Sequence, residues 1–251
     1  MLLSLIIPVY NEAGHLNKFL QELDSFDFGT PVEFVFVNDC SKDESLTIMN
    51  SFSFKNKSQI IDLKINQGKG NAIRVGIEKA SGTVIAVQDA DFEYSLDDLK
   101  VLIQPILNNK ADIVFGSRFR KNGVQVHRTF HYFINRFLTV FSNLCSGLYL
   151  TDMETCYKVF RAEIIQNINL QSNRFGFEPE VTAKIARLKA RIEEYPIKYF
   201  PRTYMEGKKI SWKDGVAALW HIAYFNLFID KTRFFKKQMP PHFIPRGSQW
   251  L

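Results

Sequence analysis

The chain has 251 residues, a mass of 29.1 kDa, 46% hydrophobic and 23% charged residues, and a formal net charge of +6. This balance is typical of a folded globular chain and excludes collagen-like, disordered and disulfide-rich small scaffolds. The charge is unevenly divided, because residues 1–112 carry 10 basic and 16 acidic side chains whereas residues 113–251 carry 22 and 10. The second part also holds 15 of the 23 phenylalanines, so we expect the two parts to face different partners.

Short apolar runs alternate with helical patterns over the first 116 residues. The apolar runs are continuous and β-branched, as in buried parallel strands, and they lie at Leu3–Val9, Val32–Asn38, Ile60–Leu63, Val84–Gln88 and Ile113–Gly116. Helical spacing lies between them, at Glu12–Leu23, Asp43–Phe52, Gly70–Ala80 and Leu96–Asn108. Ser41 and Ser95 stand where N-terminal caps are expected. The pattern predicts an α/β fold with a doubly wound, mostly parallel sheet, in which ligands bind beyond the carboxyl ends of the strands.

The cysteines and the apolar segments indicate the compartment. Cys40, Cys145 and Cys156 have no metal-ligand spacing and are odd in number, which argues against a disulfide framework and predicts a reducing compartment. No basic region precedes the apolar run at the N-terminus, so this run is predicted to be a buried strand rather than a signal peptide. The stretch Val216–Ile229 is shorter than the roughly 18 residues that span a bilayer. We therefore expect a cytoplasmic protein.

Two carboxylates, Asp89 and Asp91, come directly after the fourth predicted strand. Hard oxygen ligands at the edge of a sheet suit Mg²⁺ or Mn²⁺ that bridges a diphosphate. The alternative is a solvated pair that caps the next helix. Glu93 is either a further metal ligand or a surface charge.

The segment Asn66–Asn71 joins the third strand to a helix and contains two glycines and Lys69. Its backbone N–H groups are candidates to approach an anion, and a plain tight turn is the alternative. Asp39, after the second strand, is placed either to accept from a base or ribose or to cap a helix.

The second part of the chain has a basic and aromatic composition. Residues 113–151 contain no acidic side chain. Helical spacing puts Phe130, Phe133, Phe137 and Phe141 on one stripe, which is typical either of a core or of a helix at an anionic membrane or lipid phosphate. Nucleic acid is disfavoured as a partner, because its basic grooves do not usually accompany a carboxylate metal turn.

The order of these motifs resembles glycosyltransferase family 2, in the branch of polyprenyl-phosphate mannose and glucose synthases. The resemblance covers about Leu3–Phe228 and is carried by Ile6–Glu12, Val37–Asp43, Asn66–Ala72, Gln88–Tyr94, Phe115–Phe119, Thr151–Arg161, Asn173–Lys184 and Arg202–Gly215. It implies a GT-A fold and an inverting transfer from a nucleotide-diphosphate sugar with one Mg²⁺ or Mn²⁺. The chain departs from the mannose synthases at residues 152–157 and 206–209, which leaves a UDP- or GDP-linked donor and its sugar open.

The resemblance also implies roles for single residues. The nucleoside would be held by Pro8, Tyr10, Glu12 and Asp39, with Lys69 nearby. The sugar phosphate and the metal would be held by Asp89 and Asp91, with Glu93 as a second metal ligand. The acceptor phosphate would be clamped by Arg118 and Arg136, and Arg202 would reach the diphosphate.

The acceptor decides which further residue is needed. A phosphate acceptor is already a nucleophile and needs cations to hold it, whereas a sugar hydroxyl needs a carboxylate base, for which Asp152 or Glu154 is available. Asp152 is otherwise structural.

The sequence thus predicts a hexosyltransferase that acts on a polyprenyl phosphate, peripheral on the inner face of the membrane. Residues 1–229 form the GT-A domain, with a nucleotide-sugar half at 1–116 and an acceptor half at 117–229, and residues 230–251 form a basic aromatic tail. One alternative is transfer to a glycan hydroxyl in cell-envelope synthesis. The other is a non-catalytic nucleotide-sugar-binding subunit that recruits a membrane-protein partner.

Overall fold

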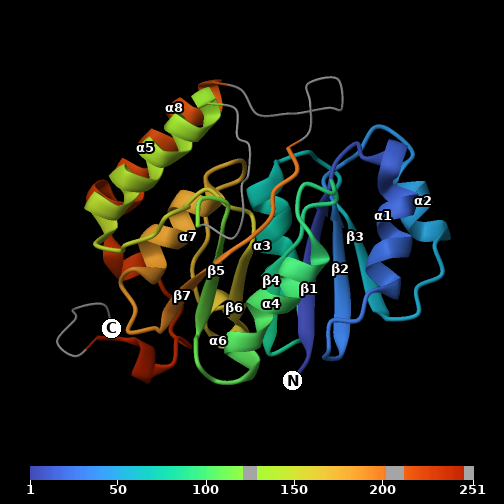
Figure 1. Cartoon of the computed structure of the whole chain (residues 1–251), viewed down its shortest axis with the longest axis horizontal. Coiled ribbons are helices and arrows are strands. Elements are labelled where there is room, and N and C mark those ends of the chain that lie inside the picture. The colour runs from blue at the N-terminus through green and yellow to red at the C-terminus, as the bar shows by residue number, and fades with distance from the viewer. Residues whose placement is uncertain (121–128, 202–211, 246–251) are drawn as a thin grey trace.

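The computed structural model describes residues 1–120, 129–201 and 212–245. A sheet of seven strands forms its centre, in the order β3-β2-β1-β4-β6-β5-β7 (Figure 1). The strands are β1 (Leu3–Val9), β2 (Val32–Asn38), β3 (Lys57–Asp62), β4 (Val84–Val87), β5 (Ile113–Ser117), β6 (Lys158–Arg161) and β7 (Ile192–Pro196). The helices are α1 (Ala13–Ser25), α2 (Ser45–Ser51), α3 (Lys69–Lys79), α4 (Leu96–Leu107), α5 (Thr129–Ser146), α6 (Ala162–Ile165), α7 (Phe177–Ile185) and α8 (Trp212–Ala223).

The predicted α/β sheet is confirmed and is mostly parallel. β6 runs antiparallel between β4 and β5, and the other pairs of neighbours are parallel. β1, β2 and β4 are buried almost throughout, which explains their continuous apolar sequences. Each of the five predicted strands is present within three residues of its expected bounds.

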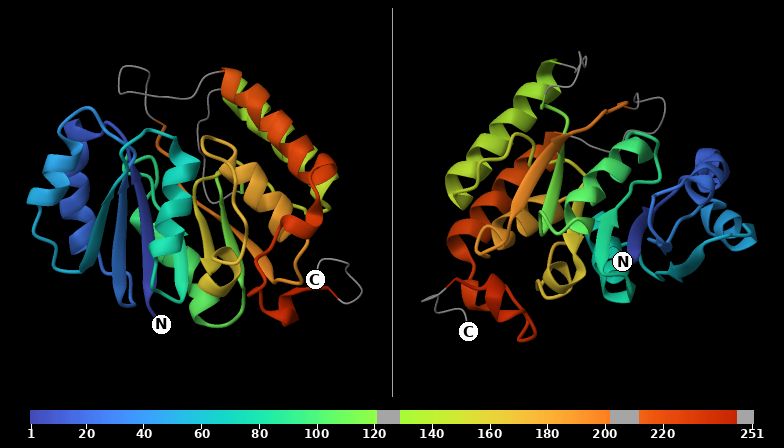
Figure 2. Two further views of the ribbon diagram at one scale, coloured as in Figure 1. Left: turned by 180° about the vertical axis from the view of Figure 1, so that it is seen from behind. Right: turned by 60° about the horizontal axis from the view of Figure 1, so that its bottom comes forward.

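Helices cover both faces of the sheet. α4 lies in front of the sheet in Figure 1, and α3 lies in front when the molecule is turned by 180° (Figure 2, left). α5 and α8 form a pair at one end of the molecule, where Leu138 and Met153 pack with Ala218 and Ile222 in a small core of their own. No helix among residues 1–120, 129–201 and 212–245 is both long and apolar enough to cross a membrane.

The strand order reverses between β1 and β4, which is where a doubly wound sheet is expected to form a crevice at the carboxyl ends of its strands. The chain moves outward from β1 to β2 and β3 and then returns to the other side of β1 with β4. Ligands bind at such a reversal, beyond the carboxyl ends of the strands. The loops that follow β1, β2 and β4 meet there, and they carry the polar residues that the sequence singled out.

The predicted helix caps have different outcomes. Ser95 caps α4 as expected, because its side chain accepts from the N–H of Asp97. Ser41 does not cap α2, since that helix begins at Ser45 and the Ser41 hydroxyl instead accepts from the N–H of Asn11 (3.1 Å).

The segment after residue 229 packs back onto the sheet domain. Phe234 is fully buried, and Met239 and Phe243 belong to the main core. Residues 168 and 235 also form a β-bridge. As far as residue 245, the aromatic side chains of the predicted tail therefore complete the core.

A buried carboxylate joins β2 to the start of β4. Glu33 lies on β2 with its side chain 1% exposed, 2.7 Å from the Lys57 ammonium. Its two oxygens also accept from the hydroxyl of Ser4, from the N–H and hydroxyl of Ser81, and from the N–H of Gly82. These donors outweigh the burial of the carboxyl and lower its pKa from 4.5 to about 2.

We expect Glu33→Gln to lower the free energy of unfolding by about 3 kcal/mol at neutral pH, the value of a pKa shift of this size. A carboxyl with a lowered folded-state pKa stabilises the fold above pH 4.5, and this contribution is lost as the pH falls toward 2. Denaturant unfolding from pH 7 down to pH 3 measures the difference, with Glu22→Gln on the exposed side of α1 as the control. A difference that does not shrink with falling pH would contradict the assignment.

Candidate active site

The loop after β3 folds around the carboxylate of Asp39, which directly follows β2. Asp39 Oδ1 accepts from the N–H of Gln67 (3.0 Å), and Oδ2 accepts from the N–H of Gly68 (2.7 Å) and from Asn66 Nδ2 (3.0 Å). Asp39 is buried. These hydrogen bonds to Asp39 therefore hold the loop beside the ends of β1 and β2.

The rest of this loop is clasped by a segment that precedes α7. The N–H of Gly70 donates to the carbonyl of Arg174 and the N–H of Asn71 to that of Asn173. A side chain at Gly68, whose φ is +98°, would collide with the same segment. The expectation that these amides approach a ligand anion is wrong, because the amides are committed to Asp39 and to neighbouring carbonyls, as in the tight-turn alternative.

Glu12 and the Asp-Ala-Asp turn are connected through a histidine. His15 Nε2 lies 2.9 Å from Glu12 Oε2 and 2.9 Å from the carbonyl oxygen of Ala90. Pro8 lies on β1 opposite Val37 in the register, and Tyr10 follows that strand. The structure thus brings the residues expected at the nucleoside to the edge that carries the carboxylates.

Lys69 and Asp89 form an ion pair beneath this edge. Lys69 Nζ lies 2.8 Å from Asp89 Oδ2 and 3.9 Å from Glu178 Oε1 on α7. Burial disfavours the charged amine, but these carboxylates raise the pKa of Lys69 well above its ordinary value. Lys69 is therefore a fixed positive charge at the carboxyl end of β4.

Asp91 and Glu93 lie on the turn between β4 and α4. Asp91 Oδ1 accepts from the N–H of Glu93 (3.1 Å), and Glu93 Oε2 accepts from the hydroxyl of Tyr199 (3.1 Å). No group of three or more His, Cys, Asp or Glu side chains within the described parts of the chain is arranged to hold a metal. The carboxylates still fit Mg²⁺ or Mn²⁺, because such ions are commonly held by one or two carboxylates together with substrate phosphates.

On the other side of the crevice, Arg118 is held by Asp152. The Arg118 guanidinium donates from Nε to Asp152 Oδ2 (2.7 Å) and from Nη2 to Oδ1 (2.8 Å). The backbone N–H of Arg118 also donates to Oδ2 (3.0 Å). The carboxylate is fully buried. A bidentate ion pair of this kind fixes the plane of the guanidinium.

Arg136, on α5, reaches the neighbouring residue. Its Nη1 donates to the carbonyl oxygen of Thr151 (2.9 Å). Both arginines expected at the acceptor phosphate are therefore anchored to consecutive residues, 151 and 152. Arg202, expected at the diphosphate, lies outside the described residues.

Tyr199 connects the two sides of the crevice. Its hydroxyl donates to Glu93, and the Arg118 guanidinium lies 5.2 Å from the centre of its ring. Glu93, which follows β4, and Arg118, which follows β5, therefore both contact Tyr199. The sequence predicted that side chains following these strands would lie near each other at the shared edge of the sheet.

Glu154 is an unusual buried acid in the same region. Its Oε1 is buried and has no hydrogen-bond partner among the described residues. Burial first, and then the nearby charge of Glu178, raise its pKa to about 8, although Lys158 opposes the shift. Glu154 is therefore a neutral carboxylic acid at pH 7.

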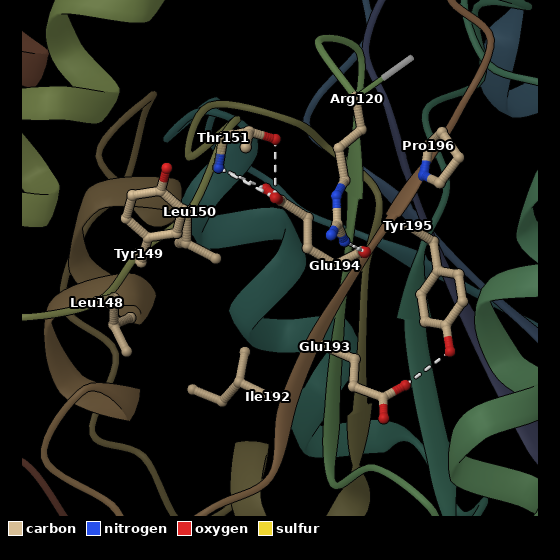
Figure 3. Close-up of a pocket in the computed structure, with 10 residues that line it drawn as sticks. All are labelled: Arg120, Leu148, Tyr149, Leu150, Thr151, Ile192, Glu193, Glu194, Tyr195 and Pro196. Atoms are coloured by element: carbon tan, nitrogen blue, oxygen red, sulfur yellow. Dashed lines mark hydrogen bonds between the residues drawn. The ribbon is translucent and has the colours of Figure 1, made fainter. Parts of the chain in front are cut away.

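Two surface pockets lie away from the Asp89–Asp91 turn. One, of about 530 Å³, is lined by Asp112, Arg161 and Arg191 at the opposite end of the sheet. The other, of about 540 Å³, lies between the loop after α5 and the edge strand β7 (Figure 3). It is lined by Arg120, Leu148, Tyr149, Leu150, Thr151, Ile192, Glu193, Glu194, Tyr195 and Pro196.

Sequence reasoning missed several residues of this site. His15 could have been found from its position three residues after Glu12 on a predicted helix. Glu194 gave no such signal because it lies on β7, a strand that local patterns did not reveal, and Tyr199 lies in the segment that follows that strand.

The mostly parallel doubly wound sheet, with paired carboxylates in the turn after β4, is that of a GT-A glycosyltransferase domain. The chain belongs to the family described as Glycosyl transferase family 2, whose model matches residues 4–168. The resemblance found in the sequence is thereby confirmed.

The chain is also similar to proteins whose names state a polyprenyl phosphate. The chain is 29% identical to a dolichyl-phosphate beta-glucosyltransferase of Trichomonas vaginalis over 226 residues, 82% of this chain and 67% of the relative. It is 27% identical to the dolichol-phosphate mannosyltransferase of Pyrococcus furiosus, over 83% of this chain and 59% of the relative. It is 29% identical to the undecaprenyl-phosphate mannosyltransferase of Micrococcus luteus, over 81% and 85%.

Solved structures share the fold. Glucosyl-3-phosphoglycerate synthase from Mycobacterium tuberculosis, solved with Mn²⁺, UDP and phosphoglyceric acid, has a TM-score of 0.66 at 13% identity and covers 92% of this chain and 80% of its own. Mannosyl-3-phosphoglycerate synthase from Rubrobacter xylanophilus has the same TM-score at 15% identity, over 96% and 79%. At this identity the likeness shows the fold.

We expect Glu154→Gln to stabilise the protein at alkaline pH. The wild-type acid keeps its proton in the fold up to about pH 8 but loses it near pH 4.5 when unfolded, so wild-type stability falls as the pH rises between these values. The amide has no proton to lose. The free energy of unfolding of the variant should therefore exceed that of wild type increasingly from pH 5 to pH 9, with Glu163→Gln, on the exposed start of α6, as the control. A constant difference would exclude a raised pKa.

Proposed function

We propose that the chain is an inverting hexosyltransferase that moves a sugar from a nucleotide-diphosphate donor to a polyprenyl phosphate. One observation carries this proposal: the turn that holds Asp89, Asp91 and Glu93 is joined to Arg118 through Tyr199, whose hydroxyl donates to Glu93 and whose ring lies against the Arg118 guanidinium. Carboxylates suit a metal-bound diphosphate, and arginines suit a phosphate monoester. The relatives that act on dolichyl and undecaprenyl phosphates agree with this pairing.

In the proposed reaction an oxygen of the acceptor phosphate forms a bond to the anomeric carbon as the bond from that carbon to the diphosphate breaks. Asp91, with Asp89 and Glu93 beside it, would hold Mg²⁺ or Mn²⁺, which would neutralise charge on the leaving nucleoside diphosphate. Arg118 and Arg136 would hold the acceptor phosphate against the repulsion of the donor. The nucleoside would lie at Tyr10, Glu12 and Asp39.

Transfer to a glycan hydroxyl is the second candidate, and the carboxylates disfavour it. A hydroxyl acceptor needs a general base in contact with it. Asp152 already accepts three hydrogen bonds from Arg118, and Glu154 is protonated at pH 7 because its pKa is raised to about 8. A phosphate acceptor needs no base, so the arrangement favours it.

We expect Asp91→Asn to reduce metal-dependent release of nucleoside diphosphate by about 100-fold or more, because a direct metal ligand is lost. Wild type is incubated with radiolabelled UDP- and GDP-hexoses, Mn²⁺ and polyprenyl phosphate, and label that partitions into organic solvent is counted. Asp97→Asn, on the exposed first turn of α4, is the control.

The same assay separates the alternatives. Label that stays in water while nucleoside diphosphate is released would favour a hydroxyl acceptor or hydrolysis. Stabilisation of wild type by nucleoside diphosphate with Mn²⁺ but no turnover with any donor would favour a binding subunit.

We also propose that the protein binds the cytoplasmic face of a membrane through α5 and α8. The outer face of α5 exposes Phe133 (65%) and Phe137 (60%), and α8 exposes Trp220 (60%). Phe141, which the sequence placed on the same stripe, instead packs toward the core between the two helices. The exposed apolar side chains and the acid-free segment 113–151 suit an anionic lipid surface.

The double variant Phe133→Ser/Phe137→Ser should bind anionic phospholipid vesicles at least about tenfold more weakly, since each exposed ring would contribute apolar burial on binding. Co-sedimentation with vesicles measures the binding. Val101→Ser, on the exposed face of α4 (53%), is the control. Equal binding by both variants would rule out α5 as the contact.

A further inference from the structure

The dipeptide Thr151–Asp152 is the common anchor of the two arginines. The Asp152 carboxylate holds Arg118, and the Thr151 carbonyl oxygen holds Arg136. A shift of this dipeptide would move both guanidinium groups together. The group that fixes the dipeptide therefore controls the geometry of the arginine pair.

That group is the carboxylate of Glu194 on the edge strand β7 (Figure 3). Its Oε1 accepts from the N–H of Thr151 (2.9 Å) and of Asp152 (3.1 Å), and its Oε2 accepts from the Thr151 N–H (3.0 Å) and hydroxyl (2.7 Å). Every polar hydrogen of the dipeptide backbone points to this one carboxylate. An ionised acid suits the role, because all of its partners are donors.

A second bond extends the anchor to β5. Ser117 Oγ lies 2.6 Å from Thr151 Oγ1 and accepts from the N–H groups of Phe119 and Arg120. Since the Thr151 hydroxyl donates to Glu194, the Ser117 hydroxyl donates to Thr151. The turn that carries Arg118 is thus linked to the Glu194 carboxylate through the hydroxyls of Ser117 and Thr151.

We propose that Glu194 is a positioning residue for the acceptor-phosphate clamp: from outside the crevice, it sets the spacing of Arg118 and Arg136 through Thr151–Asp152. The inference rests on the proposed function, since the two arginines are the proposed clamp. Asp89 and Lys69, which would meet the donor, pair with each other, whereas the Glu194 carboxylate is bonded to Thr151 and Asp152. Its effect should therefore fall on the acceptor.

The chain supplies a matched control in the preceding residue. Glu193 lies on the same strand and lines the same pocket, but its carboxylate accepts from the hydroxyl of Tyr195 (2.7 Å). Glu193→Gln and Glu194→Gln remove the same charge from the same strand. The difference between them isolates the bonds to Thr151 and Asp152.

We expect Glu194→Gln to lower kcat/KM for polyprenyl phosphate by about tenfold or more, as the loss of a group that orients a ligand commonly does. The KM for the nucleotide sugar and the thermal shift with nucleoside diphosphate and Mn²⁺ should stay at wild-type values. Glu193→Gln should match wild type in all three measurements. Arg136→Ala serves as the reference for direct loss of an acceptor contact.

Equal acceptor kinetics in the two glutamine variants, or equal losses for donor and acceptor in Glu194→Gln, would overturn the inference. If Glu194→Gln does not fold, Thr151→Val, which removes the hydroxyl and keeps the N–H, replaces it and should show a smaller loss in the same direction. If wild type itself transfers no sugar to polyprenyl phosphate, the proposed function fails, and that result is distinct from any difference between variants.

Discussion

The ion pair between Arg118 and Asp152 is the interaction on which the arrangement of side chains beyond β5 depends. A buried carboxylate without a partner costs several kcal/mol, and Asp152 avoids that cost because all three hydrogen bonds it accepts come from Arg118. The pair can form at this position because β5 ends beside the segment that leads into β6. The nearby Glu154 keeps its proton, because burial first, and then the charge of Glu178, raise its pKa to about 8.

The residues after β2 and β4 obey the same constraint with different partners. Asp39 and Asp89 are both acids at the ends of strands, yet Asp39 accepts hydrogen bonds from backbone amides and Asp89 is paired with the Lys69 ammonium. The amide bonds hold the backbone of the loop after β3, whereas the ion pair joins two side chains and leaves the backbone of the turn after β4 unbound by it.

The sequence predicted those parts of the structure that depend on local pattern. The first five strands and four helices follow from continuous apolar runs and helical spacing, and the meeting of Asp39, Asp89 and Glu12 follows from parallel strands that end at one edge. β6 and β7 are four and five residues long and carry charged side chains, so periodicity did not reveal them. Tyr199 and Glu194 act across the fold, and their partners are set by strand register rather than by spacing in the chain.

The uneven charge of the sequence is related to where the acids lie that hold the basic segment in place. The segment 113–151 contains four arginines, one lysine and two histidines but no acid, so it cannot neutralise its own cations. The fold supplies the missing carboxylates from beyond the segment, from Asp152 at its end and from Glu194 on a strand more than forty residues away. An arginine held by a carboxylate on one side keeps its remaining N–H donors in a defined direction. Acids that lie outside a basic segment can therefore orient its cations toward an anionic substrate without neutralising the segment as a whole.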